Sequence, residues 1–193
     1  MRKTKNVFVL LLAGVFLAVV VELFAGETEE LAFSIRKLAP QTVLYTVYRG
    51  PYEGIGQSIG DLHALAARKK IIPRANGMWL VYLNNPQNTP PEHCLTEIRI
   101  PVGEEALQKA GSLGPMTDVK KVQPMDVAVM TKLGRTDYGL VMRTLYERIA
   151  KEGYRPIDNA IEGFIGDWVN TNDHSQMKSE IIVPVTKVGS GGN

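Results

Sequence analysis

One short segment of the sequence combines a carboxylate with large aromatic side chains at strand spacing. Glu162, Phe164 and Trp168 are separated by even numbers of residues, so on a regular β-strand they point to the same face. Burying a carboxylate without a partner is costly, so this face is either exposed to solvent or the wall of a pocket that contains one acid. Such a pocket suits a cationic aromatic ligand, through charge pairing and ring stacking, or general acid catalysis.

Further aromatic rings come from the first half of the chain. Tyr45 and Tyr48 lie in one apolar run, and Trp79 and Tyr82 lie in another. The spacing within each pair is odd, so the two rings of a pair cannot face the same side of a regular strand. The spacing alone leaves open which ring of each pair faces Glu162.

Two more tyrosines, Tyr52 and Tyr138, lie where an apolar run is followed by a helix-like segment. Loops at such places often form the rim of a site, and packing within the turn is an equally good interpretation. We expect Glu162 to be the polar group of the site and, if the protein is an enzyme, its general acid or base. The candidate ligand-binding residues are Glu162, Phe164, Trp168, Tyr48, Tyr52, Trp79, Tyr82 and Tyr138.

An internal repeat predicts the elements that carry these residues. Residues 97–102 and 180–185 both match the pattern E-I-x-[IV]-P-V, and Pro40 and Pro124 open similar apolar runs at nearly the same offset. Self-similarity of this kind indicates a duplicated structural unit. The matched order of landmarks in both copies makes chance a poor explanation.

Each half of the repeat predicts a strand, a helix and two more strands. The helices follow from apolar residues that recur every three or four positions, which are Ile55, Ile59, Leu62 and Ala66 in the first half and Val141, Leu145 and Ile149 in the second. The later strands are expected at 78–83, 94–102, 160–169 and 178–185. We expect an α+β fold whose two modules, about residues 31–102 and 117–185, form one curved antiparallel sheet with both helices packed against it.

The first 25 residues have a separate character. Arg2, Lys3 and Lys5 precede an uncharged apolar run, which is typical of a signal peptide or, if it is not cleaved, of a membrane anchor through residues 7–25. Positive charge before the run favours an N-terminus in the cytoplasm and a body outside it. We therefore expect an exported or membrane-anchored domain over residues 26–188, followed by a flexible tail at 189–193.

Charge and cysteine content narrow the classes of partner. Residues 1–25 hold three of the 22 basic and one of the 20 acidic residues, so the rest of the chain carries equal numbers of both. A neutral body lacks the basic surface that nucleic-acid binding requires, so no nucleic-acid partner is expected. The single cysteine, Cys94, cannot form an internal disulfide, and the three histidines do not form a recognisable metal motif. No metal or cofactor is expected.

The landmarks together resemble the GyrI-like family over about residues 31–185. They are residues 48–52 before the first helix, 81–86 and 90–92 after it, the two Pro-Val endings, and Gly134 with Tyr138. This family includes effector-binding domains of AraC-type and MerR-type regulators and is related to the SOUL haem-binding proteins. The resemblance implies that a carboxylate on the penultimate strand faces the ligand. Glu162-Gly163-Phe164 fits the family's loose E-x-[YF] pattern there.

The resemblance implies a small-molecule-binding domain, and we expect a hydrophobic or aromatic ligand, cations included, in the cleft between the two halves. Some relatives resemble hydrolases that open strained rings with an acidic residue, so a hydrolase of electrophilic small molecules that uses Glu162 is the alternative. A haem-binding or protein-interaction module is the further alternative. Haem would need an axial ligand in the pocket, and the histidines are not obviously placed to supply one.

Overall fold

A computed structural model describes the body of the chain, residues 31–74, 77–85, 88–165, 175 and 177–189. The expected leader at 1–25, Trp168 and the tail beyond Gly189 lie outside the described residues. Within the described ranges, no helix has both the length and the apolar character needed to cross a bilayer.

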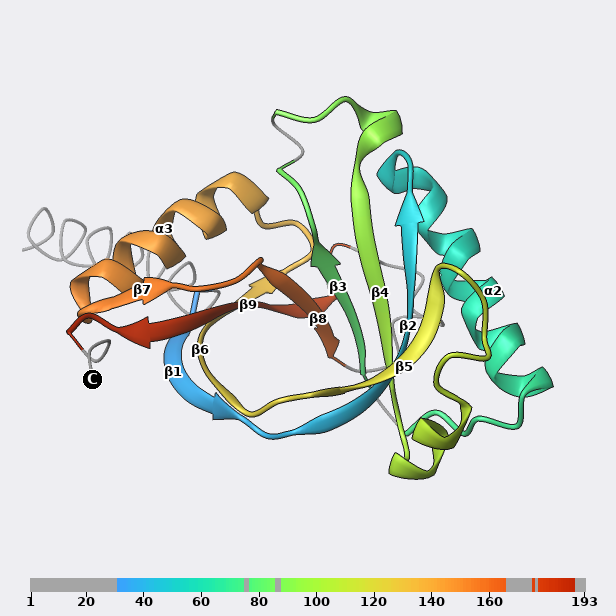
Figure 1. Cartoon of the computed structure of the whole chain (residues 1–193). Coiled ribbons are helices and arrows are strands. Elements are labelled where there is room, and N and C mark those ends of the chain that lie inside the picture. The colour runs from blue at the N-terminus through green and yellow to red at the C-terminus, as the bar shows by residue number, and fades with distance from the viewer. Residues whose placement is uncertain (1–30, 75–76, 86–87, 166–174, 176, 190–193) are drawn as a thin grey trace, which may run out of the picture. The chain divides into compact units, whose positions relative to one another are not determined.

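The described residues form nine strands, two α-helices and three short 3₁₀ helices. The strands are β1 (Phe33–Leu38), β2 (Gln41–Arg49), β3 (Met78–Tyr82), β4 (Leu95–Val102), β5 (Thr117–Val122), β6 (Met125–Leu133), β7 (Tyr154–Pro156), β8 (Ile161–Ile165) and β9 (Lys178–Lys187). The helices are α2 (Ile55–Arg68), α3 (Tyr138–Lys151), η1 (Tyr52–Gly54), η2 (Pro91–His93) and η3 (Glu104–Lys109). The predicted α+β fold is therefore confirmed, with a curved antiparallel sheet and two main helices (Figure 1).

The strand order shows how the two modules combine. The order is β1-β6-β9-β8-β3-β4-β2-β5, with β7 added beside β9, and every pairing is antiparallel. The three strands predicted for each half lie together, and β8 and β3 join the halves. Three strands were not predicted. The short β7 pairs with β9 of its own half, whereas β1 pairs with β6 of the other half and β5 pairs with β2 of the other half. Each half therefore contributes one strand to the outer edge of its neighbour.

The predicted apolar helix faces are confirmed. All seven of their residues are buried: Ile55, Ile59, Leu62, Ala66, Val141, Leu145 and Ile149. Helix α3 begins at a capped end, because Asp137 Oδ1 accepts a 2.7 Å hydrogen bond from the Leu140 amide. It ends beside Gly153, whose φ of 76° is the left-handed conformation that glycine adopts without steric cost.

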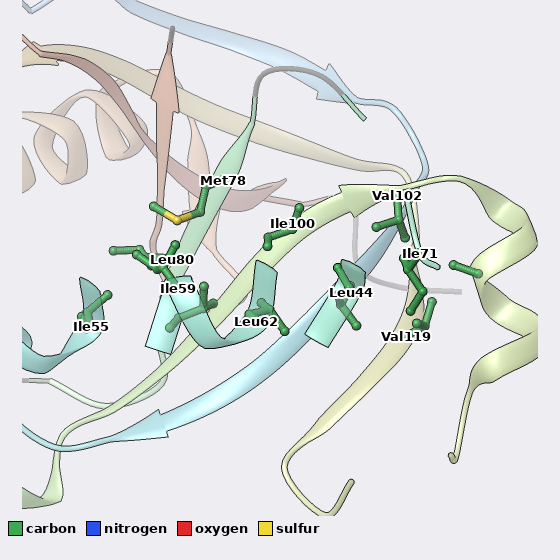
Figure 2. Packing of buried hydrophobic residues seen from close by; sticks show 13 residues of the cluster. Leu44, Ile55, Ile59, Leu62, Ile71, Met78, Leu80, Ile100, Val102 and Val119 are labelled. Carbon is green, nitrogen blue, oxygen red and sulfur yellow. The ribbon is translucent and has the colours of Figure 1, made fainter. Parts of the chain in front are cut away.

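The sheet has a separate buried apolar cluster on each of its two faces. Helix α2 packs on one face, where its Ile59 and Leu62 meet Leu44, Leu80 and other buried residues of β2, β3 and β4 (Figure 2). The opposite face carries a separate buried cluster, made of Val81, Val127, Val129, Ile161 and Ile182. Residues that oppose each other across antiparallel strands share a face, so each paired residue of β8 can be assigned to one of the two faces.

Candidate functional site

Glu162 lies on the helix-covered face of the sheet, at the junction of the two halves. It stands opposite Leu80 of β3 on one side and Ile181 of β9 on the other. Leu80 belongs to the cluster under α2, so the carboxylate points to the same side. Glu162 is only 7% exposed, so it does not lie on a solvent-exposed face.

Within the described part of the chain, the buried carboxylate has three partners. Tyr82 donates a hydrogen bond from its hydroxyl to Glu162 Oε2 at 2.7 Å, and Ser179 donates one to Oε1 at 3.0 Å. The ammonium of Lys132 lies 3.2 Å from Oε1. These contacts satisfy both carboxylate oxygens and balance the charge, which is what allows the group to be buried.

Lys132 and Ser179 were not among the predicted site residues. Lys132 lies on β6 opposite Ser179 of β9, and Ser179 also lies opposite Phe164 of β8. Lys132 is two residues beyond Met130, which is buried, so strand alternation directs its side chain to the core face. The sequence contained one signal for this ion pair, which is a lysine at a core-facing position of a strand. A buried ammonium requires an anion nearby.

Three tyrosine rings gather near this carboxylate. The Tyr82 ring lies edge-on to the rings of Tyr52 and Tyr138, with centroid distances of 5.6 and 6.0 Å. Tyr52 begins η1 just before α2, Tyr138 is the first residue of α3, and Tyr82 is the last residue of β3. The N-terminal ends of both helical segments therefore meet at the end of β3. Tyr52 is 40% exposed and is the outermost of the three. We call Tyr52, Tyr82 and Tyr138 the tyrosine cluster.

The environment keeps the inner tyrosines protonated. Burial, followed by the charge of Glu162, raises the pKa of Tyr82 and of Tyr138 well above its usual value, and burial also raises the pKa of Tyr52. A phenol that stays neutral can donate a hydrogen bond to a carboxylate or to a ligand oxygen. The cluster therefore offers aromatic surface together with hydroxyl donors.

The remaining predicted site residues lie in different surroundings. Phe164 shares the face of Glu162 and packs against the cluster under α2. Tyr48 also packs there, and its hydroxyl donates a 2.9 Å hydrogen bond to the Pro51 carbonyl across the turn before α2. The structure therefore brings Tyr52, Tyr82, Tyr138 and Phe164 to the face of Glu162, with Tyr48 in the adjoining core.

Trp79 does not join the site around Glu162. It stands opposite Gly163, and its ring packs in the second apolar cluster with Val81 and Ile161 on the other face of the sheet. Because side chains alternate along β3, the rings of Trp79 and Tyr82 point to opposite faces of the sheet. The β3–β8 register places Tyr82 on the face of Glu162 and Trp79 on the other face. The structure therefore separates Trp79 from Glu162, and the part of Trp79 in ligand binding stays a prediction.

A groove of about 320 Å³ lies away from the carboxylate. Its walls come from β2, β5 and α2, and it includes Tyr48, Arg49, Asp61 and Arg68. We favour the Glu162 site, because a buried charged network with convergent donors is stronger evidence of function than an open groove on the surface.

Two of the three histidines, His63 and His93, lie in the described residues. His63 is exposed on α2, and His93 contacts the guanidinium of Arg49. Within the ranges that the structure describes, no group of three acidic, histidine or cysteine side chains is placed to hold a metal ion.

Comparisons with known proteins agree with this architecture. A family model described as the GyrI-like small molecule binding domain matches residues 31–186. A search of curated proteins gives no significant match.

Solved structures with the same fold share little sequence. The crystal structure of the EcmrR C-terminal domain is 13% identical, with a TM-score of 0.67 over 82% of this chain and 99% of that one. The EcmrR–DNA complex is 13% identical, with a TM-score of 0.69 over 97% and 70% of the two chains. A hydrolase from Listeria innocua is also 13% identical, with a TM-score of 0.59 over 86% and 97%. Since the family model covers most of the sequence, this chain belongs to the GyrI-like small molecule binding domain family.

Proposed function

We propose that this domain binds a small, hydrophobic, aromatic molecule at the tyrosine cluster, with Glu162 at the polar end of the site. The observation that carries the proposal is the 2.7 Å hydrogen bond from Tyr82 to the buried carboxylate. The Tyr82 ring also contacts the rings of Tyr52 and Tyr138, which lie at the N-terminal ends of η1 and α3. Membership of a small-molecule-binding family supports the same conclusion.

The chemistry of the cluster fits an aromatic ligand. Edge-to-face ring contacts contribute about 0.5–1.5 kcal/mol each beyond the burial of area, and Tyr52 and Tyr138 both flank Tyr82. Tyr52 is the most exposed ring, so its rotation is the simplest movement that admits a ligand. The proposed place of binding is then the β3–β8 junction, where the two modules meet.

A ligand screen followed by two variants tests this function. Compounds that raise the melting temperature of the purified protein are titrated by calorimetry, because a ligand that binds only the folded state stabilises it. Tyr82→Phe and Glu162→Gln are expected to weaken binding by about 1–3 kcal/mol. The control is Tyr45→Phe, which alters a ring that lies over Lys120 instead. Equal affinity in all four proteins would exclude this site.

A second candidate function is hydrolysis of a strained or electrophilic small molecule. It is favoured by the close approach of a protonated Tyr82 to Glu162. Glu162 would accept a proton from an attacking water, and a tyrosine hydroxyl would hydrogen-bond to the oxygen on which charge develops. Incubation with an excess of an activated cyclopropane distinguishes the two functions, because an enzyme consumes many equivalents and a binding protein consumes at most one.

The cellular setting is proposed from the sequence alone. A signal peptide or anchor in residues 1–25 would make the domain exported or membrane-bound, and cell fractionation with protease accessibility tests this. The EcmrR relative is seen in complex with DNA. We propose no nucleic-acid partner here, because residues 26–193 have equal numbers of acidic and basic side chains. A gel-shift experiment with duplex DNA checks that proposal.

A further inference from the structure

We propose that Lys132 sets the charge selectivity of the Glu162 site, so that the site selects uncharged aromatic molecules over permanent aromatic cations. The inference rests on the proposed function and narrows its ligand class. It differs from the expectation formed from the sequence, in which an isolated acid at the end of an aromatic pocket would attract cations.

The geometry of the ion pair carries this inference. Lys132 Nζ lies 3.2 Å from Glu162 Oε1, and the two side chains are only 10% and 9% exposed. Among the residues that the structure describes, the other partners of the carboxylate are Tyr82 and Ser179, and neither carries a charge. The polar end of the site therefore has a carboxylate and an ammonium whose charges cancel, instead of one uncompensated negative charge.

A permanent cation meets two obstacles at such a site. If Lys132 stays in place, the cation lies beside a like charge in surroundings of low polarity, where repulsion is strong. If Lys132 is displaced, its buried ammonium loses its anion, which is costly unless it reaches water. An uncharged ring meets neither obstacle, and an oxygen or nitrogen acceptor on it suits hydroxyl and ammonium donors.

A matched pair of ligands tests the proposal. Acridine and N-methylacridinium have nearly the same shape, and at a pH where acridine is uncharged only the second carries a positive charge. Their affinities are measured by fluorescence titration on the full chain, and quinoline with N-methylquinolinium provides an independent pair. The wild-type protein is expected to bind the uncharged member about tenfold tighter, or more.

Variants then assign the preference to Lys132. Lys132→Met is expected to improve binding of the cation by about tenfold or more, since Glu162 becomes an uncompensated acid. Lys132→Arg keeps the charge and should keep the wild-type preference. The double variant Lys132→Met with Glu162→Gln has no charge at the site and should bind both members alike. This double variant also keeps the test valid if Lys132→Met alone folds poorly.

A control lysine separates the local effect from total charge. Lys120 pairs with Glu97 at 2.7 Å and lies over the Tyr45 ring, away from the tyrosine cluster. Lys120→Met makes the same change in net charge and is expected to leave the affinity ratio unchanged.

The outcomes distinguish this inference from the proposed function. A wild-type protein that prefers the cation, or a ratio that Lys132→Met and Lys120→Met change equally, overturns the charge selectivity while binding itself stands. If none of the proteins binds either pair and the screen yields no ligand whose affinity depends on Tyr82 and Glu162, the proposed function fails and the inference fails with it.

Discussion

The hydroxyl of Tyr82 donates a 2.7 Å hydrogen bond to Glu162, although the two residues are 80 positions apart in the sequence. The contact exists because β3 pairs with β8, the strands at which the two halves of the chain meet. Leu80 faces Glu162 directly across that pair, and Tyr82 lies two residues further along the same face. The candidate site therefore depends on the junction of the modules, and neither module contains it alone.

Removing the Tyr82 hydroxyl should destabilise the protein. Tyr82→Phe keeps the ring and leaves Glu162 Oε2 without the donor that it has in the wild type, so the free energy of unfolding should fall by about 1–3 kcal/mol. Urea denaturation measures this difference. The matched control is Tyr48→Phe, which removes a more exposed hydrogen bond to the Pro51 carbonyl and should cost about 1 kcal/mol or less. A larger loss in the control would contradict the assigned importance of the Glu162 contact.

Features that depend only on the spacing of residues within one helix or strand could be predicted from the sequence. The helix faces are an example, because spacing along one helix decides which side chains share a face, and Ile59 and Leu145 are buried as expected. The same holds for the common face of Glu162 and Phe164, since strand alternation is also local. The repeat extended these local signals to a correct fold class.

The features that depend on pairing between distant strands could not be predicted. Nothing near Lys132 identifies Ser179 or Glu162 as its neighbours, because the register of β6, β9 and β8 determines those contacts. The choice between Trp79 and Tyr82 likewise required the β3–β8 register. The exchange of β1 and β5 between halves was missed for the same reason, since a strand's own residues do not specify its partner.

Lys132 and Glu162 should be strongly coupled in stability. Lys132→Met leaves a carboxylate buried without its cation and should lower the free energy of unfolding by about 3–5 kcal/mol. Adding Glu162→Gln removes the unpaired charge and should recover much of that loss. A double-mutant cycle measured by urea denaturation gives the coupling energy. Additive effects of the two changes would mean that the pair is not formed in solution.

The tyrosine cluster should make the fold sensitive to alkali. Tyr82 and Tyr138 have pKa values raised by burial above the usual value of about 10. Between about pH 10 and the raised values, the folded state holds more protons than the unfolded state, so stability decreases as pH rises. The contribution of these two tyrosines to the free energy of unfolding is fully present below about pH 10 and is lost as the pH rises above that value.

A double variant isolates this alkaline effect. Tyr82→Phe with Tyr138→Phe removes both groups, so its free energy of unfolding should decrease less steeply above pH 10 than that of the wild type. Denaturation midpoints measured across that range provide the comparison. Tyr146→Phe, on the outer part of α3 where the Tyr146 side chain is 40% exposed, is the control and should have a smaller effect on the slope. Parallel profiles for all three proteins would contradict the assigned environment.

Crowding the opposite face of the sheet should lower stability without changing ligand binding. A Cβ atom at Gly163 would lie 3.3 Å from Trp79 Cδ1, which is a tight contact with a rigid ring, and 3.4 Å from Ile182 Cδ1, which is the limit of ordinary contact. Gly163→Ala should therefore lower the free energy of unfolding by about 1–3 kcal/mol. Its neighbour Glu162 points to the other face, so affinity for a ligand of the tyrosine cluster should be unchanged at a temperature where the variant is folded. A fall in affinity as large as that of Tyr82→Phe would mean that the two faces are not independent and that the ligand reaches Trp79.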